Sequence, residues 1–243
     1  MTRARVDARP ANRLLARLPQ DAFEQCRPHL TTIALRARQV LQKQDARIHY
    51  VYFPNGGIIS MATVLSDGAV VEAATIGSEG MVGIEAFFSG RSVSPCETMV
   101  QVPMLHDSAE RMRISDFRRA LDQSEVLHAA VAQFAQVLYA RITRLTACNV
   151  RHDLNERCAR WLLMAHDQME GKDFHLSQEF LAVMLGVRRQ TVSLVAGAFR
   201  RAGFIRYVQG RIAVVDRKGL EAAACECYES ISGLYHSLRR ERG

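Results

Sequence analysis

The segment at residues 177–201 constrains the fold most, because two short helical patterns there are separated by a short turn that contains a glycine. Ser177 stands at the N-cap position of the first pattern, residues 178–185, and Gly186 follows its last residue. A helix C-terminus favours a left-handed residue there, and glycine adopts this conformation without steric cost. The apolar residues expected to form the buried side are Phe180, Leu181, Met184 and Leu185. The second pattern begins within a few residues, so the sequence predicts two helices joined by a short turn.

The second helix of this segment has an apolar face and a polar face. The apolar face carries, at helical spacing, Val192, Val195 and Phe199. The opposite face carries Gln190, Ser193, Leu194, Gly197 and Arg201, with Arg189 on the flank. A helix after a glycine-containing turn that presents arginine, glutamine and serine near its N-terminus fits the major groove of DNA. Arginine can bind a guanine edge and glutamine an adenine edge, whereas Thr191 and Arg188 suit phosphate contacts.

A short hairpin is predicted directly after this helix. Residues 204–208 and 211–215 flank Gln209 and Gly210, a pair that suits a tight turn. Such a hairpin is the wing of a winged helix, and we expect Arg211 to contact DNA from it. Residues 177–217 hold seven arginines against Glu179 and Asp216, so about five of the seven net positive charges of the chain fall in this module. A charged face is usually only solvated, but together with the turn and the hairpin it predicts binding to double-stranded DNA.

The rest of the chain shows two architectures. From residue 31 to about residue 114, short β-like runs alternate with turn signals, whereas the pattern from residue 115 onward is almost entirely helical. The sequences PNGG at residues 54–57 and SDG at residues 66–68 are expected to reverse the chain. Ser115 is expected to cap a helix at residues 116–121. These patterns predict an α+β protein with an N-terminal antiparallel β-roll or sandwich.

A long helix is predicted from about residue 125 to residue 149. Its apolar residues recur in alternating steps of three and four, namely Leu127, Val131, Phe134, Leu138, Ile142 and Leu145. The stripe either pairs with a second copy of the chain or packs on the β domain of its own chain. Its length and narrowness resemble a coiled-coil seam and favour a homodimer held by these residues.

The six cysteines include no CxxC pair, which argues against a zinc ribbon or an iron–sulfur cluster. Cys225 and Cys227 come nearest to a site, but an i, i+2 separation on a predicted helix points their thiols in different directions. We therefore expect scattered reduced thiols and no bound metal. A terminal helix is predicted after residue 216, and its apolar residues are Leu220, Ala224, Cys227, Ile231, Leu234 and Leu238. It packs on its own domain or contributes to dimerisation or to contact with RNA polymerase.

The sequence shows no membrane or secretion signal and no enzyme motif. Its apolar runs fall short of the roughly 20 residues needed to cross a bilayer, and its N-terminus lacks the apolar core of a secretory signal. We expect a cytoplasmic protein that does not contact membranes. A nucleophile elbow, a phosphate loop, an HExxH motif and a paired-acid motif are all missing, so catalysis is not expected.

The segment LSQEFLAVMLGVRRQTVSLVAGAFRRAGFI at residues 176–205 resembles the Crp/Fnr superfamily of transcription regulators. A weaker likeness covers YVYFPNGGIIS, LSDGAVVEAATIG and SEGMVG, which look like the β-roll of the cyclic-nucleotide-binding fold. The resemblance implies a sensor domain at residues 1–123, a dimerisation helix at 124–150, a winged helix-turn-helix at 151–217 and a helical extension at 218–243. It also implies a homodimer on a palindromic operator.

The same resemblance assigns roles to single residues. Arg189 and Gln190 fall on two base-reading positions of the family, and Ser193 falls on a third that some branches use. Leu194 stands where many relatives carry an arginine, so we expect a different operator half-site, in which leucine can touch a thymine methyl group. Arg188 replaces the serine or threonine often found at the start of this helix, which leaves the N-terminal amides to a DNA phosphate.

The sensor half departs further from the family. Gly80 and Gly83 match its glycines, and Glu85 is a displaced candidate for the ribose-binding glutamate. The stretch SVSPCETMVQVP at residues 92–103 contains no arginine to neutralise a cyclic phosphate, so cyclic AMP binding is not expected. We expect no required cofactor, and the effector is left open. One alternative function stays open: a ligand-binding signalling module whose helix-turn-helix contacts another protein.

Overall fold

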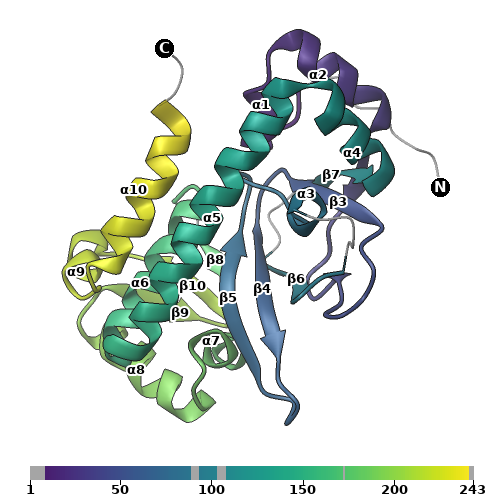
Figure 1. Cartoon of the computed structure of the whole chain (residues 1–243). Coiled ribbons are helices and arrows are strands. Elements are labelled where there is room, and N and C mark those ends of the chain that lie inside the picture. Colours follow the sequence, from purple (N-terminus) through teal and green to yellow (C-terminus); the bar gives the residue numbers. More distant parts are fainter. Residues whose placement is uncertain (1–8, 89–92, 103–107, 172, 241–243) are drawn as a thin grey trace. The chain divides into compact units, whose positions relative to one another are not determined.

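The computed structural model describes residues 9–88, 93–102, 108–171 and 173–240, with side chains up to residue 234 (Figure 1). In chain order, the first elements are α1 (Arg13–Ala16), α2 (Gln20–Cys26), η1 (Arg27–His29), β1 (Thr31–Ala34), β2 (Val40–Gln42), β3 (Tyr50–Pro54), β4 (Ile58–Val64), β5 (Val70–Ile76), α3 (Glu85–Phe88), β6 (Glu97–Val102) and β7 (Ser108–Arg113). The later elements are α4 (Ile114–Gln123), α5 (Glu125–Arg151), α6 (Leu154–Gln168), β8 (Phe174–His175), α7 (Gln178–Leu185), α8 (Arg189–Arg201), β9 (Ile205–Val208), β10 (Arg211–Val214), α9 (Arg217–Ala222) and α10 (Cys227–Arg240).

The chain packs as two compact units, residues 1–61 with 75–138 and residues 62–74 with 139–243. The boundaries fall inside β4, β5 and α5, so these three elements continue from one unit into the other. The four-part division expected from the sequence stays a prediction.

The first unit is a β-roll of short strands, as predicted. One sheet has the order β1-β7-β3 and the other has the order β2-β6-β4-β5. Strand β7 pairs antiparallel with both neighbours, so that Tyr52 and Thr31 each lie opposite Arg111. The core contains Phe53 and Phe117, whose ring centroids lie 6.3 Å apart. Apolar side chains that alternate along the strands therefore bury one face of the roll.

The turn between β4 and β5 forms at the predicted residues. Gly68 has φ +83°, and its N–H donates to the carbonyl of Leu65 at 2.9 Å. The Asp67 carboxylate accepts from the Ala69 N–H at 2.9 Å, the local bond that suits aspartate to turns. The predicted start of the next helix was wrong by two residues. Helix α4 begins at Ile114 with Arg113 as N-cap, so Ser115 lies inside the helix and does not cap it.

The apolar stripe of α5 is buried within the chain itself, which corrects the predicted intermolecular seam. The stripe residues Leu127, Val131, Phe134, Leu138 and Leu145 are all buried, and Ile142 is half-buried. The reason is visible at Gly80, where an added Cβ would lie 2.0 Å from Cε2 of Phe134. The ring of Phe134 thus packs against Gly80 in space that any side chain at position 80 would fill. Five residues of the stripe are core and Ile142 is half-buried, so this face is not an exposed seam for a second copy.

The second unit is built around α6, which begins with the predicted capping box. The Asp153 carboxylate accepts from the Glu156 N–H at 3.0 Å, and the Glu156 carboxylate accepts from the Asp153 N–H at 2.9 Å. Trp161 is buried in this helix, and its Nε1 donates to Oε1 of Glu72 at 2.9 Å. Helices α7, α9 and α10 pack against α6. The core of this unit therefore lies along one helix.

The C-terminal region forms two helices where one was predicted. Helix α9 ends at Ala222 and α10 begins at Cys227, so the chain turns between them. Leu220, Cys227 and Ile231 are buried, as expected for packing on the chain's own domain. The side chain of Leu238 lies outside the described residues.

The turn between α9 and α10 also corrects the prediction for the cysteines. Cys225 precedes α10 and Cys227 is its first residue, so the i, i+2 geometry of a single helix does not apply. Their thiols converge with that of Cys148, whose Sγ lies 3.5 Å from Sγ of Cys225. All six cysteines are buried free thiols. The expected scatter of thiols is therefore wrong for these three cysteines.

Among the described residues, no single helix is long and apolar enough to span a membrane. Only α7 and α8 taken together pass by length and composition, and they are bent by 106° at their junction.

Candidate nucleic-acid interface

Helices α7 and α8 form the predicted helix-turn-helix. The Ser177 hydroxyl accepts from the Phe180 N–H at 3.1 Å and so caps α7. At the other end Gly186 has φ +66°, the left-handed conformation expected of the glycine that ends a helix. The guanidinium of Arg157 donates from Nη2 to the carbonyl of Leu185 at 2.7 Å. Both ends of α7 are therefore satisfied by hydrogen bonds that fix the direction in which α8 begins.

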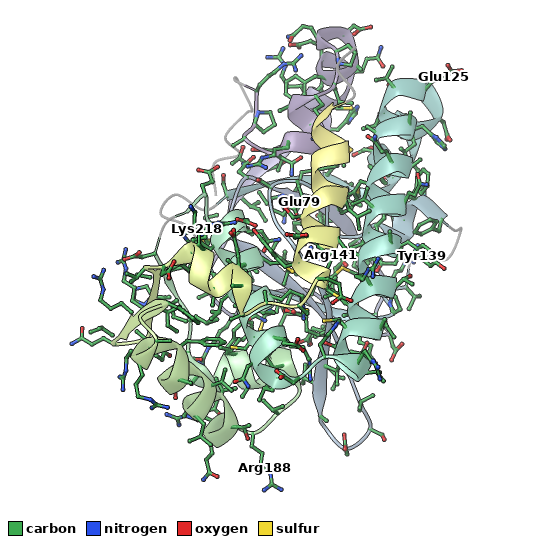
Figure 2. All side chains as sticks on the ribbon, turned by 90° about the vertical axis from the view of Figure 1, so that its left-hand side faces the viewer. Glu79, Glu125, Tyr139, Arg141, Arg188 and Lys218 are labelled. Atoms are coloured by element: carbon green, nitrogen blue, oxygen red, sulfur yellow. The ribbon has the colours of Figure 1, made fainter. Side chains whose placement is uncertain are left out.

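Helix α8 buries its apolar face and exposes its polar face, as the sequence predicts. Val192, Val195 and Phe199 are buried, while Arg188, Gln190 and Leu194 are exposed. Figure 2 shows the Arg188 side chain extending outward from the start of α8. Leu194 is 74% exposed on the same face. This face is presented to solvent and is available for contact with another molecule.

The three residues assigned to base reading do not lie in equivalent settings. Arg189 is exposed, and its Nη1 lies 3.7 Å from the exposed carboxylate of Glu179, an ion pair of the kind that contributes little in water. Gln190 is exposed as well. Ser193 is half-buried, and its hydroxyl donates to Oε1 of Gln178 at 2.6 Å, which ties α8 to α7. The position of Ser193 as a reader stays a prediction, because in this structure its hydroxyl proton is used inside the protein.

The predicted hairpin is present and gains a third strand. Strands β9 and β10 pair antiparallel around Gln209 and Gly210, both of which have positive φ (+49° and +77°), as the tight hairpin turn requires. Strand β8 adds to the free edge of β10, where Arg211 lies opposite His175. Sequence reasoning missed β8, because two residues give no measurable alternation. The Tyr207 hydroxyl donates to the Leu176 carbonyl at 2.8 Å and anchors the wing, and burial raises the pKa of this phenol.

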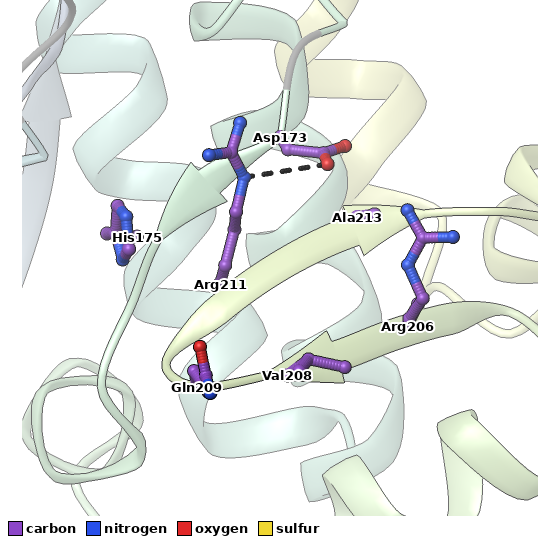
Figure 3. Close-up of a pocket in the computed structure, with 7 residues that line it drawn as sticks. All are labelled: Asp173, His175, Arg206, Val208, Gln209, Arg211 and Ala213. Atoms are coloured by element: carbon purple, nitrogen blue, oxygen red, sulfur yellow. Dashed lines mark ion pairs between the residues drawn. The ribbon is translucent and has the colours of Figure 1, made fainter.

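The wing and the end of α8 expose arginines besides Arg211, which was the one wing residue predicted to contact DNA. Arg211 is exposed, and its Nε lies 3.6 Å from the carboxylate of Asp173 (Figure 3). Arg206 lies on the neighbouring strand and borders the same shallow hollow. On α8, Arg200 and Arg201 are exposed too. The arginine count of this segment was the signal for these residues, although only Arg211 was assigned a contact. Exposed arginines on both α8 and the wing make this surface strongly basic.

In the β-roll, the predicted effector residues lie where the backbone packs closely. Gly80 is covered by Phe134, and Gly83 has φ +91° with space for a Cβ limited by Gln42 Nε2 at 2.7 Å. Glu85 begins α3, and its Oε2 is buried without a hydrogen-bond partner among the described residues. Burial raises the pKa of this carboxyl. The glycines have packing and turn roles that account for them, and their part in an effector pocket stays a prediction.

Comparisons with known proteins agree with this geometry. A model of the Crp-like helix-turn-helix domain matches residues 156–223. The transcriptional regulator SdrP of Thermus thermophilus is 28% identical over 177 residues, which are 69% of this chain and 80% of SdrP.

Solved structures share the fold at low identity. FixK2 from Bradyrhizobium japonicum superposes with a TM-score of 0.69 at 18% identity, over 81% of this chain and 98% of FixK2. TTHB099, a transcriptional regulator of the CRP family from Thermus thermophilus, superposes with a TM-score of 0.66 at 22% identity, over 79% of this chain and 95% of its own. The matched domain and the related regulator support a DNA-binding transcription regulator that carries a Crp-like helix-turn-helix domain, and the solved structures share its fold.

Proposed function

We propose that the chain acts as a homodimer that reads a two-fold symmetric operator, with α8 of each copy in the major groove. The observation that carries the proposal is the outward face of α8, where Arg188, Arg189, Gln190 and Leu194 are all exposed. Arg189 and Gln190 stand in the first turn, which is the part of a recognition helix that reaches base edges. Arginine suits guanine, glutamine suits adenine, and Leu194 suits a thymine methyl group. Arg188 and Thr191 contact phosphates on either side.

The wing extends the same surface along the DNA backbone. Arg206 and Arg211 point outward from adjacent strands and are placed to neutralise phosphates. Asp173, the ion-pair partner of Arg211, is exposed to water, so little stabilisation is lost when a phosphate replaces it as the partner of Arg211. Contacts of this kind add affinity but little sequence preference.

An electrophoretic shift assay on the promoter region of the protein's own gene tests the reading role. The double variant Arg189→Ala/Gln190→Ala is expected to lose sequence-selective binding while it keeps weak binding to any duplex. Arg119→Ala is the matched control, because it removes one exposed positive charge from α4, far along the chain from α8. Unchanged selectivity in the double variant would exclude α8 as the reader.

The exposed side of α5 supports a homodimer through a different seam from the one first predicted. Opposite the buried stripe, a second set of side chains recurs in steps of three and four, and all but the half-buried Ala132 are exposed: Ala129, Ala132, Gln136, Tyr139, Thr143, Thr146 and Val150. Figure 2 shows Tyr139 on the outer side of α5 and the buried Arg141 on the inner side. A 3.5-residue repeat along one helix face is the spacing at which two helices pair side by side. We name these seven residues the outer stripe.

Sedimentation velocity tests this seam. Thr143→Glu places a charge in the outer stripe and is expected to yield monomers, whereas Arg144→Glu places the same residue beside the stripe and should leave the dimer intact. A dimer that survives Thr143→Glu and Tyr139→Glu together would refute the seam. A two-fold symmetric dimer would bind a two-fold symmetric operator, and contact with RNA polymerase stays a prediction.

For the β-roll we propose an effector other than cyclic AMP, and no catalytic activity. The stretch at residues 92–103 contains no arginine to neutralise a cyclic phosphate, and the buried carboxylate oxygen of Glu85 adds no positive charge to the β-roll. One solved relative by fold, CLP of Xanthomonas campestris, is described as c-di-GMP responsive, so effectors within this fold are not limited to cyclic AMP. Calorimetric titration with cyclic AMP should give no heat of binding, and saturable binding would refute the proposal.

The alternative, a module whose helix-turn-helix contacts protein, predicts a different dependence on salt. Phosphate neutralisation makes the logarithm of DNA affinity fall steeply with the logarithm of salt concentration. A steep slope supports the DNA-binding mode proposed here, and a flat one supports protein contact.

A further inference from the structure

Four metal-ligating side chains converge at the end of α5, outside the DNA-reading surface. Cys148 and His152 lie one helical turn apart near the end of α5, Cys225 lies in the turn after α9, and Cys227 begins α10. The ligand atoms of these four residues all lie within 4.8 Å of one another. The three thiols are buried, and the His152 side chain is 14% exposed. Residues separated by more than 70 positions therefore meet at one point.

The distances match those of a tetrahedral zinc site. With Zn–S near 2.3 Å and Zn–N near 2.0 to 2.1 Å, tetrahedral angles place two sulfurs about 3.8 Å apart and a sulfur about 3.6 Å from a nitrogen. Here Sγ of Cys148 and Cys225 are 3.5 Å apart, and Sγ of Cys227 lies 3.7 Å from Nδ1 of His152. Small adjustments of the side chains are enough for all four atoms to face one ion.

The imidazole of His152 is oriented as in many metal sites. Its Nδ1 faces the thiols, and its Nε2 lies 3.1 Å from Oε2 of Glu226. A carboxylate on the far nitrogen holds the ring and favours the tautomer whose other nitrogen binds a metal. Glu226 stands between two of the cysteines in sequence, so the same turn supplies both kinds of group.

The charge around the cluster also suits a metal. Three thiolates, a neutral imidazole and Zn²⁺ carry a net charge of −1, which is costly to bury alone. Arg160 is buried and lies near enough to Cys148 for its positive charge to act on it. The Nε atoms of Arg157 and Arg160 have no hydrogen-bond partner among the described residues, and the charges of Cys148 and Cys225 also act on Arg157. These two arginines beside the cluster compensate a negative site.

We propose that Cys148, His152, Cys225 and Cys227 bind one Zn²⁺ in a closed tetrahedral site that fastens the segment after the wing to the end of α5. Four protein ligands leave no open position, so the site is structural and does not activate water. Each cysteine releases its proton when it binds the ion, and no oxidation is involved. This proposal goes beyond DNA recognition, and its test measures bound metal. The zinc site and the DNA-binding proposal can therefore fail independently of each other.

The test uses the full-length chain, purified without a histidine tag and under reducing conditions. Elemental analysis by mass spectrometry is expected to find one zinc per chain. Replacement by Co²⁺ should give the intense visible and charge-transfer bands of tetrahedral cobalt with thiolate ligands. Both signals should be lost in Cys148→Ser and Cys227→Ser but kept in Cys158→Ser, the matched control, because Cys158 is a buried thiol of α6 outside the cluster.

A milder variant keeps the proposal open to refutation if the cysteine variants fail to fold. Glu226 is 71% exposed, so Glu226→Gln should fold normally and lower the affinity for zinc by about 10- to 100-fold in competition with a chromophoric chelator. The proposal is overturned if the wild-type protein carries no zinc and gives no tetrahedral cobalt spectrum. It is also overturned if another metal occupies the site, or if mass mapping finds Cys148 and Cys225 joined by a disulfide in the freshly reduced protein.

Discussion

Replacing Glu72 with glutamine should remove a large part of the pH dependence of stability in the unit formed by residues 62–74 and 139–243. The carboxylate of Glu72 accepts a hydrogen bond from Trp161, while its Oε2 is buried without a hydrogen-bond partner among the described residues. Burial raises the pKa of this carboxyl from 4.5 to about 7, although the Trp161 N–H and the charges of Arg141 and Arg160 act in the opposite direction. Between about pH 4.5 and 7, Glu72 therefore keeps its proton in the folded protein but has lost it in the unfolded chain.

The sign and size of the effect follow from linkage. Because the folded pKa is the higher one, the stabilisation is complete below about pH 4.5 and is lost as the pH rises to about 7. A difference of about 2.5 pKa units at roughly 1.4 kcal/mol per unit gives a loss of about 3.5 kcal/mol as an upper value. Glutamine has no proton to lose, so the unfolding free energy of the variant should lack this decline. Between about pH 4.5 and 7 the wild type should therefore lose stability that the variant keeps.

Urea unfolding at several pH values measures this difference directly. Trp161 is the only tryptophan of the chain and donates to Glu72, so its fluorescence reports on this contact. The chain concentration is held constant, because association would change the apparent stability. Glu229→Gln, which removes a charge from an exposed position of α10, is the control and should follow the wild type. A wild-type minus Glu72→Gln difference that stays constant from about pH 5 to about pH 8 would refute the reasoning.

Three further predictions use other contacts. Gly80→Ala should lower the free energy of unfolding by about 1–3 kcal/mol in urea titrations, because the new Cβ would lie 2.0 Å from Phe134, and Phe134→Leu should recover part of the loss. Gly186→Ala should cost about 1 kcal/mol in the same assay, since alanine must adopt φ +66° at the end of α7 where the added Cβ itself meets nothing. Arg206→Ala should weaken binding to all duplexes alike and reduce the slope of log affinity against log salt by about 1, whereas a change in sequence preference would show that Arg206 reads bases.

The helix-turn-helix could be predicted from sequence because its signals are local. Ser177, Gly186 and the spacing of Val192, Val195 and Phe199 each act within one or two helical turns. The hairpin turns at Gly68 and Gly210 are equally local, because positive φ is a property of the residue and its neighbours. Such features depend little on the rest of the chain.

The contacts that sequence reasoning missed are between distant residues. The stripe on α5 has the spacing of a coiled-coil seam, but the same spacing suits a helix that lies on a β-roll, and Gly80, 54 residues before Phe134, decides between them. Cys148 and Cys225 are 77 residues apart, and no local sequence pattern predicts their contact. The break between α9 and α10 was missed for the same reason, since Leu220, Ala224 and Cys227 keep helical apolar spacing through it.

If both proposals hold, the zinc site also determines how far the outer stripe extends. Helix ends fray because their last carbonyl groups lack partners, and the last turns of α5 carry Thr146 and Val150 of the stripe on one side. The other side of the same turns carries Cys148 and His152. A metal bound there would keep these turns helical, because the metal–ligand bonds offset the conformational entropy lost in ordering them. Removal of zinc should therefore shorten the outer stripe and weaken dimerisation. Sedimentation of the chelated protein, with Glu226→Gln at limiting zinc as an intermediate case, connects the two proposals quantitatively.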